Sequence, residues 1–183
     1  MANASAAWTA VQVRALPSDG NRYEVVDGEL LVTPSPATPH QRAVGALHLA
    51  FGNYLKVHGE AEVFLSPADV EFDARTLVQP DIFVVPILEG RKLRAWVEIK
   101  SLLLAIEVLS PRTARHDRLT KRRLYQRQGI EYWIVDLDAQ IIERWRPGDD
   151  RPDILSSRIE WKGSDTVDPL VIDLEVFFED VPG

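Results

Sequence analysis

The stretch LLLAIEVLSPRTARHDRLTKRRLYQRQGIEYWIVD, residues 102–136, holds the pattern that decides the fold. Its first five residues are all apolar, as in a central strand that is covered on both faces of its sheet. Ser110-Pro111 ends that strand, and residues 112–128 are predicted to be helical, with a glycine at the C-cap. Residues 132–136 then form the next strand. The order strand, helix, strand predicts an α/β arrangement.

The sequence on both sides of this stretch supplies further strands and helices. Asp27-Gly28 lies between two apolar runs within residues 22–33, a strong hairpin signal because that turn needs positive φ. Residues 40–58 have apolar positions at spacings of three and four, which predicts an amphipathic helix. The other predicted elements are a short helix at 9–16, a proline-rich loop at 34–39, strands near 61–65, 68–72, 82–85, 96–99 and 141–145, and an apolar tail at 170–178.

Together these elements predict one domain over residues 1–183, of the α/β (α+β) class, with a mixed central sheet flanked by helices. The chain has no cysteine, which excludes disulfides and thiolate-bound zinc. No apolar run approaches the roughly 20 residues that span a bilayer. Residues 1–10 lack the pattern of a signal peptide, so we expect a cytoplasmic protein with no membrane partner.

The charge pattern gives two opposing indications about nucleic acid. The net charge of −7 weighs against broad, salt-driven binding to a phosphate chain. Residues 111–127, however, contain seven basic residues and one acid. A basic segment on an acidic body can hold a phosphate chain locally, although such runs are more often a solvated helix face.

Two carboxylates lie at the ends of predicted apolar strands. Asp81 opens the strand at residues 82–85, and Glu107 closes the central strand. A charged side chain beside a buried strand is costly unless it is paired or bound to a metal ion. If the two strands are neighbours, their oxygens would suit Mg²⁺, which activates water in phosphodiester hydrolysis. For each residue alone, an acid facing water at a strand edge is the simpler interpretation.

The predicted helix after Glu107 carries a polar row. Asp117, Lys121 and Tyr125 are spaced by four residues and therefore share one helix face. The helix has few apolar residues, so its buried side must include this row or lie partly open. Lys121 could then reach a phosphate or a metal-bound water. The alternative is a surface ion pair between Asp117 and Lys121 worth a few tenths of a kcal/mol.

A competing arrangement is Glu98-Ile99-Lys100, an acid and a lysine separated by one residue. In a strand, alternation would put Glu98 and Lys100 on the same face. The flanking residues make this segment resemble a half-exposed edge strand, whereas the strand with Glu107 resembles a central one. Because a central strand holds a site more rigidly, we favour Glu107.

Taken in order, these residues resemble the bacterial Uma-type "putative restriction endonuclease" family. The resemblance runs from about residue 23 to about residue 145, with the family's spacing, and the tail at 174–178 is similar to the family's ending. Each piece is weak alone, and all of them in order are specific. The parts of the sequence that match the family are the segments 23–30, 39–41, 79–81, 106–113 and 129–136, with Asp117, Lys121 and Tyr125.

The resemblance implies the restriction-endonuclease-like fold and a site of the PD-(D/E)XK type. Asp81 would be the acid of the Pro-Asp pair and Glu107 the second acid, holding Mg²⁺ or Mn²⁺. The pattern departs from the superfamily triplet because Leu109 stands where a lysine is expected. The lysine would instead come from the following helix, which fits Lys121. The supporting residues would be Glu24, His40, Asp117 and Tyr125.

The function that follows is a metal-dependent endodeoxyribonuclease that hydrolyses phosphodiester bonds with a magnesium-activated water. Its partner would be DNA, and a homodimer would suit a cut in both strands. The alternative is a nucleic-acid-binding or assembly protein that keeps the nuclease fold but does not cleave. A nucleotide-handling enzyme of another kind has no support, because no phosphate-cradling glycine-rich loop is present. The residues expected to contact phosphates are Arg112, Arg115, Arg118 and Arg122.

Overall fold

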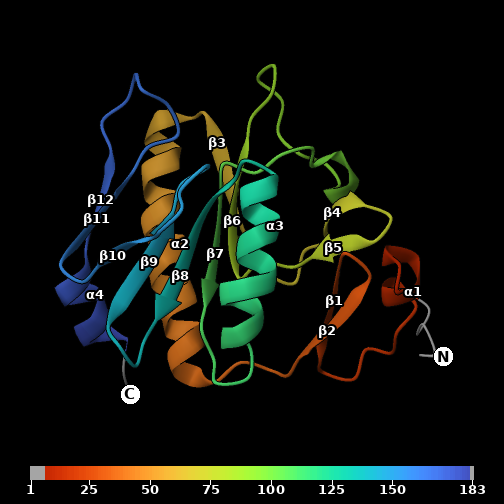
Figure 1. Ribbon diagram of the computed structural model, residues 1–183. Coiled ribbons are helices and arrows are strands. Elements are labelled where there is room, and N and C mark those ends of the chain that lie inside the picture. The colour runs from red at the N-terminus through yellow and green to blue at the C-terminus, as the bar shows by residue number, and fades with distance from the viewer. Residues whose placement is uncertain (1–6, 182–183) are drawn as a thin grey trace.

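The central element of the protein is a six-stranded mixed sheet, seen in a computed structural model that describes residues 7–181 (Figure 1). The strand order is β10-β9-β8-β7-β6-β3, and only the β7–β8 pair is parallel. This confirms the predicted mixed sheet. Its strands are β3 (Ala61–Leu65), β6 (Ile82–Pro86), β7 (Leu104–Val108), β8 (Glu131–Asp136), β9 (Ile141–Trp145) and β10 (Asp153–Leu155).

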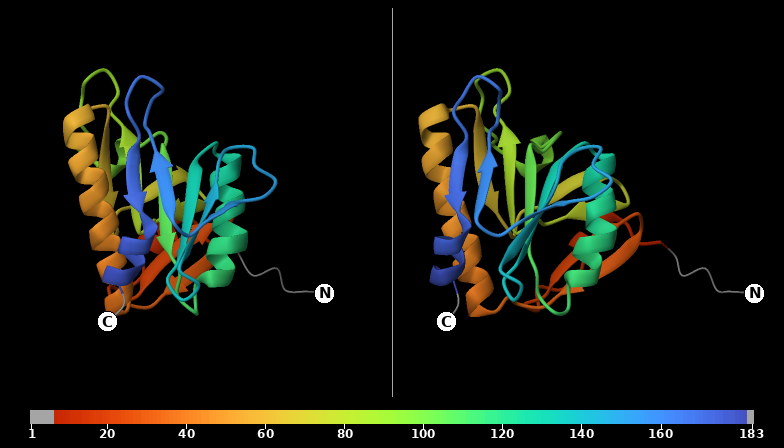
Figure 2. Two further views of the ribbon diagram at one scale, coloured as in Figure 1. Left: turned by 90° about the vertical axis from the view of Figure 1, so that its left-hand side faces the viewer. Right: turned by 60° about the vertical axis from the view of Figure 1, so that its left-hand side comes forward.

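Helices cover both faces of this sheet, so β7 is buried on both sides (Figures 1 and 2). On one face Leu104, Ile106 and Val108 belong to the apolar cluster that includes the long helix α2. On the other face Ala105 packs with residues of the helix that follows β7. Because side chains alternate along a strand, Glu107 lies on that second face. The covering elements are α2 (Thr38–His58), the π-helix η2 (His116–Lys121), α3 (Arg122–Arg127), the β11–β12 hairpin (Arg158–Trp161 and Leu170–Asp173) and α4 (Leu174–Asp180).

A second, four-stranded sheet lies beside the first and carries the N-terminal residues of the candidate site. Its order is β2-β1-β5-β4, and the β1–β2 hairpin turns through Asp27 and Gly28 with φ of 51° and 87°, as the sequence predicted. Val25 packs outward against α1, whereas Glu24 and Val26 are buried toward the main sheet. The elements are α1 (Ala10–Arg14), β1 (Arg22–Val26), β2 (Glu29–Thr33), β4 (Val70–Asp73) and β5 (Thr76–Val78).

The structure corrects three details of the sequence prediction. Trp96–Glu98 is a short 3-10 helix, η1, and not a strand, because β6 is already paired on one side with β3 and on the other with β7. Helix α2 begins at Thr38 inside the predicted loop, since proline is tolerated in a first helical turn. The helix after β7 contains the π-helical turn η2, which no sequence pattern indicated. No helix within residues 7–181 is both long and apolar enough to cross a membrane.

Candidate active site

Five chain segments bring the predicted site residues to one end of the central sheet. Ile82 pairs with Ile106, so Asp81, just before β6, and Glu107, in antiparallel β7, lie at the same end. Glu24 comes from β1, His40 from the first turn of α2, and Lys121 from the end of η2. The side chains of all five residues are buried or nearly buried. Asp81 and Glu107 lie 26 residues apart in sequence. The topology therefore makes one cluster of them.

Asp81 is held by three hydrogen-bond donors. Its Oδ2 accepts from the backbone N–H of Val108 at 2.9 Å and lies 2.9 Å from His40 Nε2, while its Oδ1 accepts from Arg22 Nη1 at 2.7 Å. Burial alone would raise the pKa of Asp81. The His40 hydrogen bond and the positive charge of Arg22 outweigh burial and hold that pKa well below its ordinary value. Asp81 is therefore an ionised acceptor.

Lys121 lies between carboxylates and is only 2% exposed. Its Nζ donates to Glu107 Oε1 at 2.8 Å, lies 2.9 Å from Glu24 Oε2 and 3.8 Å from Asp117 Oδ1. The contact with Glu24 is an ion pair without the alignment of a hydrogen bond. Burial works to lower the pKa of Lys121, but the charges of Glu107, Glu24 and Asp117 raise it above its usual value. Lys121 therefore stays an ammonium ion.

Two of the acids beside Lys121, Glu107 and Asp117, have pKa values above their ordinary range. Burial, together with the negative charges of Asp81 and Asp117, raises the pKa of Glu107 well above its usual value despite the nearby Lys121. Burial likewise raises the pKa of Asp117. A divalent cation would relieve this excess of negative charge more effectively than a proton, because it carries two charges.

Arg22 belongs to the same cluster and was missed by the sequence analysis. Besides Asp81, its guanidinium approaches Glu24 Oε2 at 3.8 Å and Glu107 Oε2 at 4.0 Å. The signal that could have identified it is strand alternation, because Arg22 and Glu24 are two residues apart in β1 and point to the same side.

The side chains present fit a hard divalent cation. When Glu24, Asp81, Glu107 and Asp117 are all ionised, Arg22 and Lys121 balance two of the four charges and leave two in excess. Carboxylate oxygens are the ligands that Mg²⁺ and Mn²⁺ prefer. Within residues 7–181 no three His, Asp or Glu side chains are already arranged as a metal cage, since the oxygens point toward Arg22 and Lys121.

Tyr125 lies deeper in the same region. It is fully buried, its ring is 4.7 Å from that of Tyr132, and its hydroxyl has no hydrogen-bond partner within the described residues. Burial and the nearby Glu107 and Glu24 raise the pKa of this phenol well above its usual value, so it remains a neutral donor.

The four arginines expected to contact phosphates divide into two groups. Arg118 is engaged by Asp136 and Glu143, each at 2.7 Å, and Arg122 donates to Gln126 and stacks on Trp145. Arg112 and Arg115 are exposed. Arg112 also lines a cavity of about 40 Å³ with Thr33, His116, Asp117 and Lys121, so this cavity borders the buried cluster.

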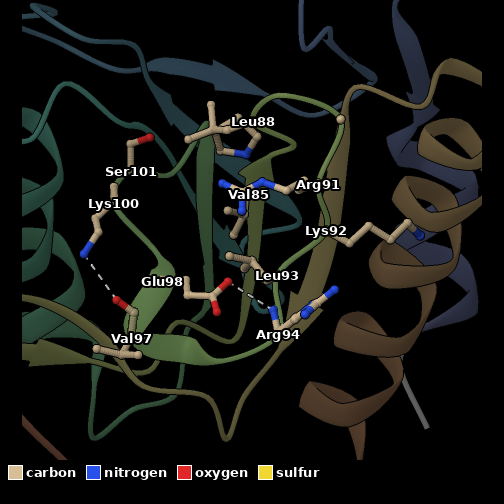
Figure 3. A pocket seen from close by; sticks show the side chains of 12 residues that line it. Val85, Leu88, Arg91, Lys92, Leu93, Arg94, Val97, Glu98, Lys100 and Ser101 are labelled. Atoms are coloured by element: carbon tan, nitrogen blue, oxygen red, sulfur yellow. Dashed lines mark hydrogen bonds between the residues drawn. The ribbon is translucent and has the colours of Figure 1, made fainter.

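The rival pair Glu98 and Lys100 lies elsewhere. Both line a larger cavity, of about 1040 Å³, at the far end of β6 from Asp81 (Figure 3). Glu98 accepts from the backbone N–H of Arg94, and Lys100 donates to the carbonyl of Val97 (Figure 3). Both side chains are exposed and they are not bonded to each other, so the acid–lysine spacing there does not form a joint site.

Comparisons with known proteins agree with this architecture. A solved structure described as a putative nuclease belonging to DUF820, from Anabaena variabilis, has a TM-score of 0.72 to this chain. The two are 19% identical, and the match covers 94% of this chain and 98% of the other, so it shows a shared fold. No curated protein matches the chain significantly. The model of the Uma2 family, described as putative restriction endonuclease, matches residues 10–175. Because that match spans most of the sequence, the chain belongs to the Uma2 family.

Proposed function

We propose that this protein is a divalent-metal-dependent nuclease that hydrolyses phosphodiester bonds in DNA. The observation that carries the proposal is the convergence of three acids at one end of the sheet. Glu24 and Glu107 face the buried, charged Lys121, and Arg22 lies between these two acids and Asp81. Membership of the Uma2 family, described as putative restriction endonuclease, supports the same reaction class.

Asp81 and Glu107 would hold Mg²⁺ or Mn²⁺, with Glu24 as a third oxygen donor. The bound ion supplies a Lewis acid and lowers the pKa of a coordinated water. His40 and the Val108 N–H fix the orientation of Asp81. Gln79 N–H does the same for Glu24, donating to its Oε1 at 2.7 Å. Such outer contacts orient metal ligands and tune their basicity.

Lys121 acts in this proposal as a charge, and not as a base. Its raised pKa keeps the ammonium protonated, so it can donate a hydrogen bond to the attacking water or to a phosphate oxygen. The exposed Arg112, at the mouth of the small cavity, would bind the phosphate next to the scissile one. Cutting both strands of a duplex would suit a homodimer, and a cytoplasmic location would place the enzyme beside its substrate.

The test is cleavage of plasmid DNA with Mg²⁺ and with Mn²⁺. The wild-type protein should nick or linearise the plasmid, whereas Asp81→Asn should not, because the amide removes an anionic ligand. Glu98→Gln is the control, since that carboxylate lies at the other end of β6. If the wild type binds DNA but cuts none with either ion, the non-cleaving alternative is the correct function.

A further inference from the structure

The Arg22 guanidinium lies where three carboxylates of the site converge. Each of its nitrogens faces a different acid: Nη1 is 2.7 Å from Asp81 Oδ1, Nε is 3.8 Å from Glu24 Oε2, and Nη2 is 4.0 Å from Glu107 Oε2. Of these three contacts only the first is a hydrogen bond, and the buried Nε has no hydrogen-bond partner among the described residues. The planar Arg22 guanidinium therefore forms a hydrogen bond to one of the three acids, which come from three segments of the chain, and not to the other two.

Two of the three oxygens that face Arg22, Asp81 Oδ1 and Glu107 Oε2, have no other positively charged partner within residues 7–181. The third oxygen, Glu24 Oε2, accepts no hydrogen bond from the described residues but is shared with Lys121 Nζ at 2.9 Å, whereas Glu24 Oε1 is bound by Gln79 N–H. Among the residues that the structure describes, Asp81 Oδ1 accepts only from Arg22, whereas Asp81 Oδ2 has two donors. Glu107 meets Lys121 through its other oxygen. The oxygens left for a cation therefore surround the guanidinium.

Of the two cations in the cluster, Arg22 is the one that can withdraw. Its side chain is 16% exposed, whereas that of Lys121 is 2% exposed and is held by three carboxylates. We propose that Arg22 is a resident counter-cation at the divalent-ion position, which the ion must displace, so that Arg22 sets the metal affinity of the site.

This inference rests on the proposed function, because it concerns the same carboxylates. Without Arg22 the acids would be left with Lys121 alone, and burying uncompensated charge destabilises a fold. With Arg22 the site is stable before the ion arrives, but part of the ion's binding energy is used to displace the guanidinium. Removing the guanidinium should therefore destabilise the metal-free protein and tighten the binding of the ion.

The experiment compares Mn²⁺ binding by calorimetry in the wild type, Arg22→Met and Arg22→Lys, with Arg144→Met as a matched control. Arg144 is a strand arginine, 13% exposed and paired with Asp153, and it is not in contact with the site acids. Arg22→Met should bind Mn²⁺ about tenfold more tightly, since a competing unit charge is gone. Arg22→Lys should stay near wild type, and Arg144→Met should not change the affinity. In EDTA the melting temperature of Arg22→Met should fall, and Mn²⁺ should raise it by more than in the wild type.

Each result separates this inference from the proposed function. If folded Arg22→Met binds Mn²⁺ no more tightly than the wild type, Arg22 is a structural residue and the inference is wrong, while a wild type that binds and cleaves keeps its function. If only Arg22→Met binds Mn²⁺, the inference stands and the wild-type nuclease function fails. If neither binds, both are overturned. Should Arg22→Met not fold, Arg22→Gln serves the same comparison.

Discussion

Lysine is almost never fully buried unless it is paired, and Lys121 satisfies that condition through Glu24, Glu107 and Asp117. The three acids in turn have Lys121 as their positively charged partner, so each side of these ion pairs compensates the buried charge of the other. The energetic role of Lys121 is therefore to permit a dense group of carboxylates in a dry interior. Its catalytic role would follow from the same charge, because an ammonium already in place needs no reorganisation when charge develops on a phosphate.

Replacing Lys121 should separate these two roles. In EDTA, Lys121→Ala should lower the free energy of unfolding by about 3–5 kcal/mol, because buried acids lose their partner, and Mn²⁺ should restore part of that loss. With Mn²⁺ bound, cleavage should fall by about 10²–10³-fold. Lys121→Arg keeps the charge but not the compact ammonium and should rescue poorly. Urea unfolding and single-turnover cleavage are the measurements, and an unchanged unfolding curve in EDTA would mean that the buried ion pairs contribute nothing.

The two candidate glutamates should differ in metal binding. Glu107→Ala should abolish Mn²⁺ binding, since it removes an acid that faces Asp81 and Glu24 across Arg22. Glu98→Ala should leave binding nearly unchanged, because Glu98 is exposed and its carboxylate accepts from the Arg94 backbone. Calorimetric titration of both variants decides the matter. The reverse order of effects would move the site to the cavity of Figure 3.

At the scale of elements, the η2–α3 helix has two separate functions along its length. Its inner side supplies Asp117 and Lys121 to the cluster, both 2% exposed. Its outer side carries arginines, of which Arg118 is tied to β8 and β9 through Asp136 and Glu143. The π-helical turn η2 contains Asp117 and Lys121 of the inner side and Arg118 of the outer side, and such turns frequently occur at functional sites.

This division predicts different effects for Arg118, within the helix, and for Arg112, in the turn that precedes it. Arg112→Ala should weaken DNA binding and reduce the slope of log affinity against log salt by about 0.9, the loss of one phosphate contact. Arg118→Ala should keep the slope and lower stability by no more than about 1 kcal/mol, because its ion pairs are partly exposed. Fluorescence anisotropy with duplex DNA in EDTA at several salt concentrations measures the slopes. An equal loss of slope in Arg118→Ala would show that this side chain leaves its acids to bind phosphate.

At the scale of the whole molecule, the C-terminal helix α4 closes the core on the face opposite to the candidate active site. Phe177 and Phe178 pack in the same cluster as α2 and the inner residues of β7. The chain thus uses one face of the central sheet for its largest apolar core and the other for the acids and the helix that neutralises them. This arrangement keeps the charged cluster out of the main core.

We expect Phe178→Ala to lower the free energy of unfolding by about 3–5 kcal/mol through loss of buried surface and a new cavity. Mn²⁺ affinity should not change, because the substitution lies behind the sheet. Val176→Ala on the same helix is the control, since Val176 is 53% exposed and should shift stability by less than about 0.5 kcal/mol. Chemical denaturation measures both. A large loss of metal affinity in Phe178→Ala would indicate that the two faces of the sheet are coupled.

The sequence by itself determined the elements and most of the acids. The Asp27-Gly28 turn signal predicted the hairpin, helical periodicity predicted the long helix, and an unbroken apolar run predicted the doubly covered strand β7. All three signals depend on neighbours within a few residues. The ends of the apolar strands indicated Asp81 and Glu107, and helical spacing indicated the row through Lys121. Each of these signals is local, so an isolated chain segment already contains it.

Only the tertiary structure decided which of these residues meet. Antiparallel pairing of β6 with β7 brought Asp81 and Glu107 to one end of the sheet. The separate β1–β2 hairpin then added Glu24 and Arg22, whose strand pattern gives no indication of charge partners far along the chain. The same pairing left Glu98 in the 3-10 helix η1, and Lys100 just after it, outside the sheet. Coulombic and hydrogen-bonding contacts depend on distances in space, and strand order sets those distances, whereas spacing in sequence does not.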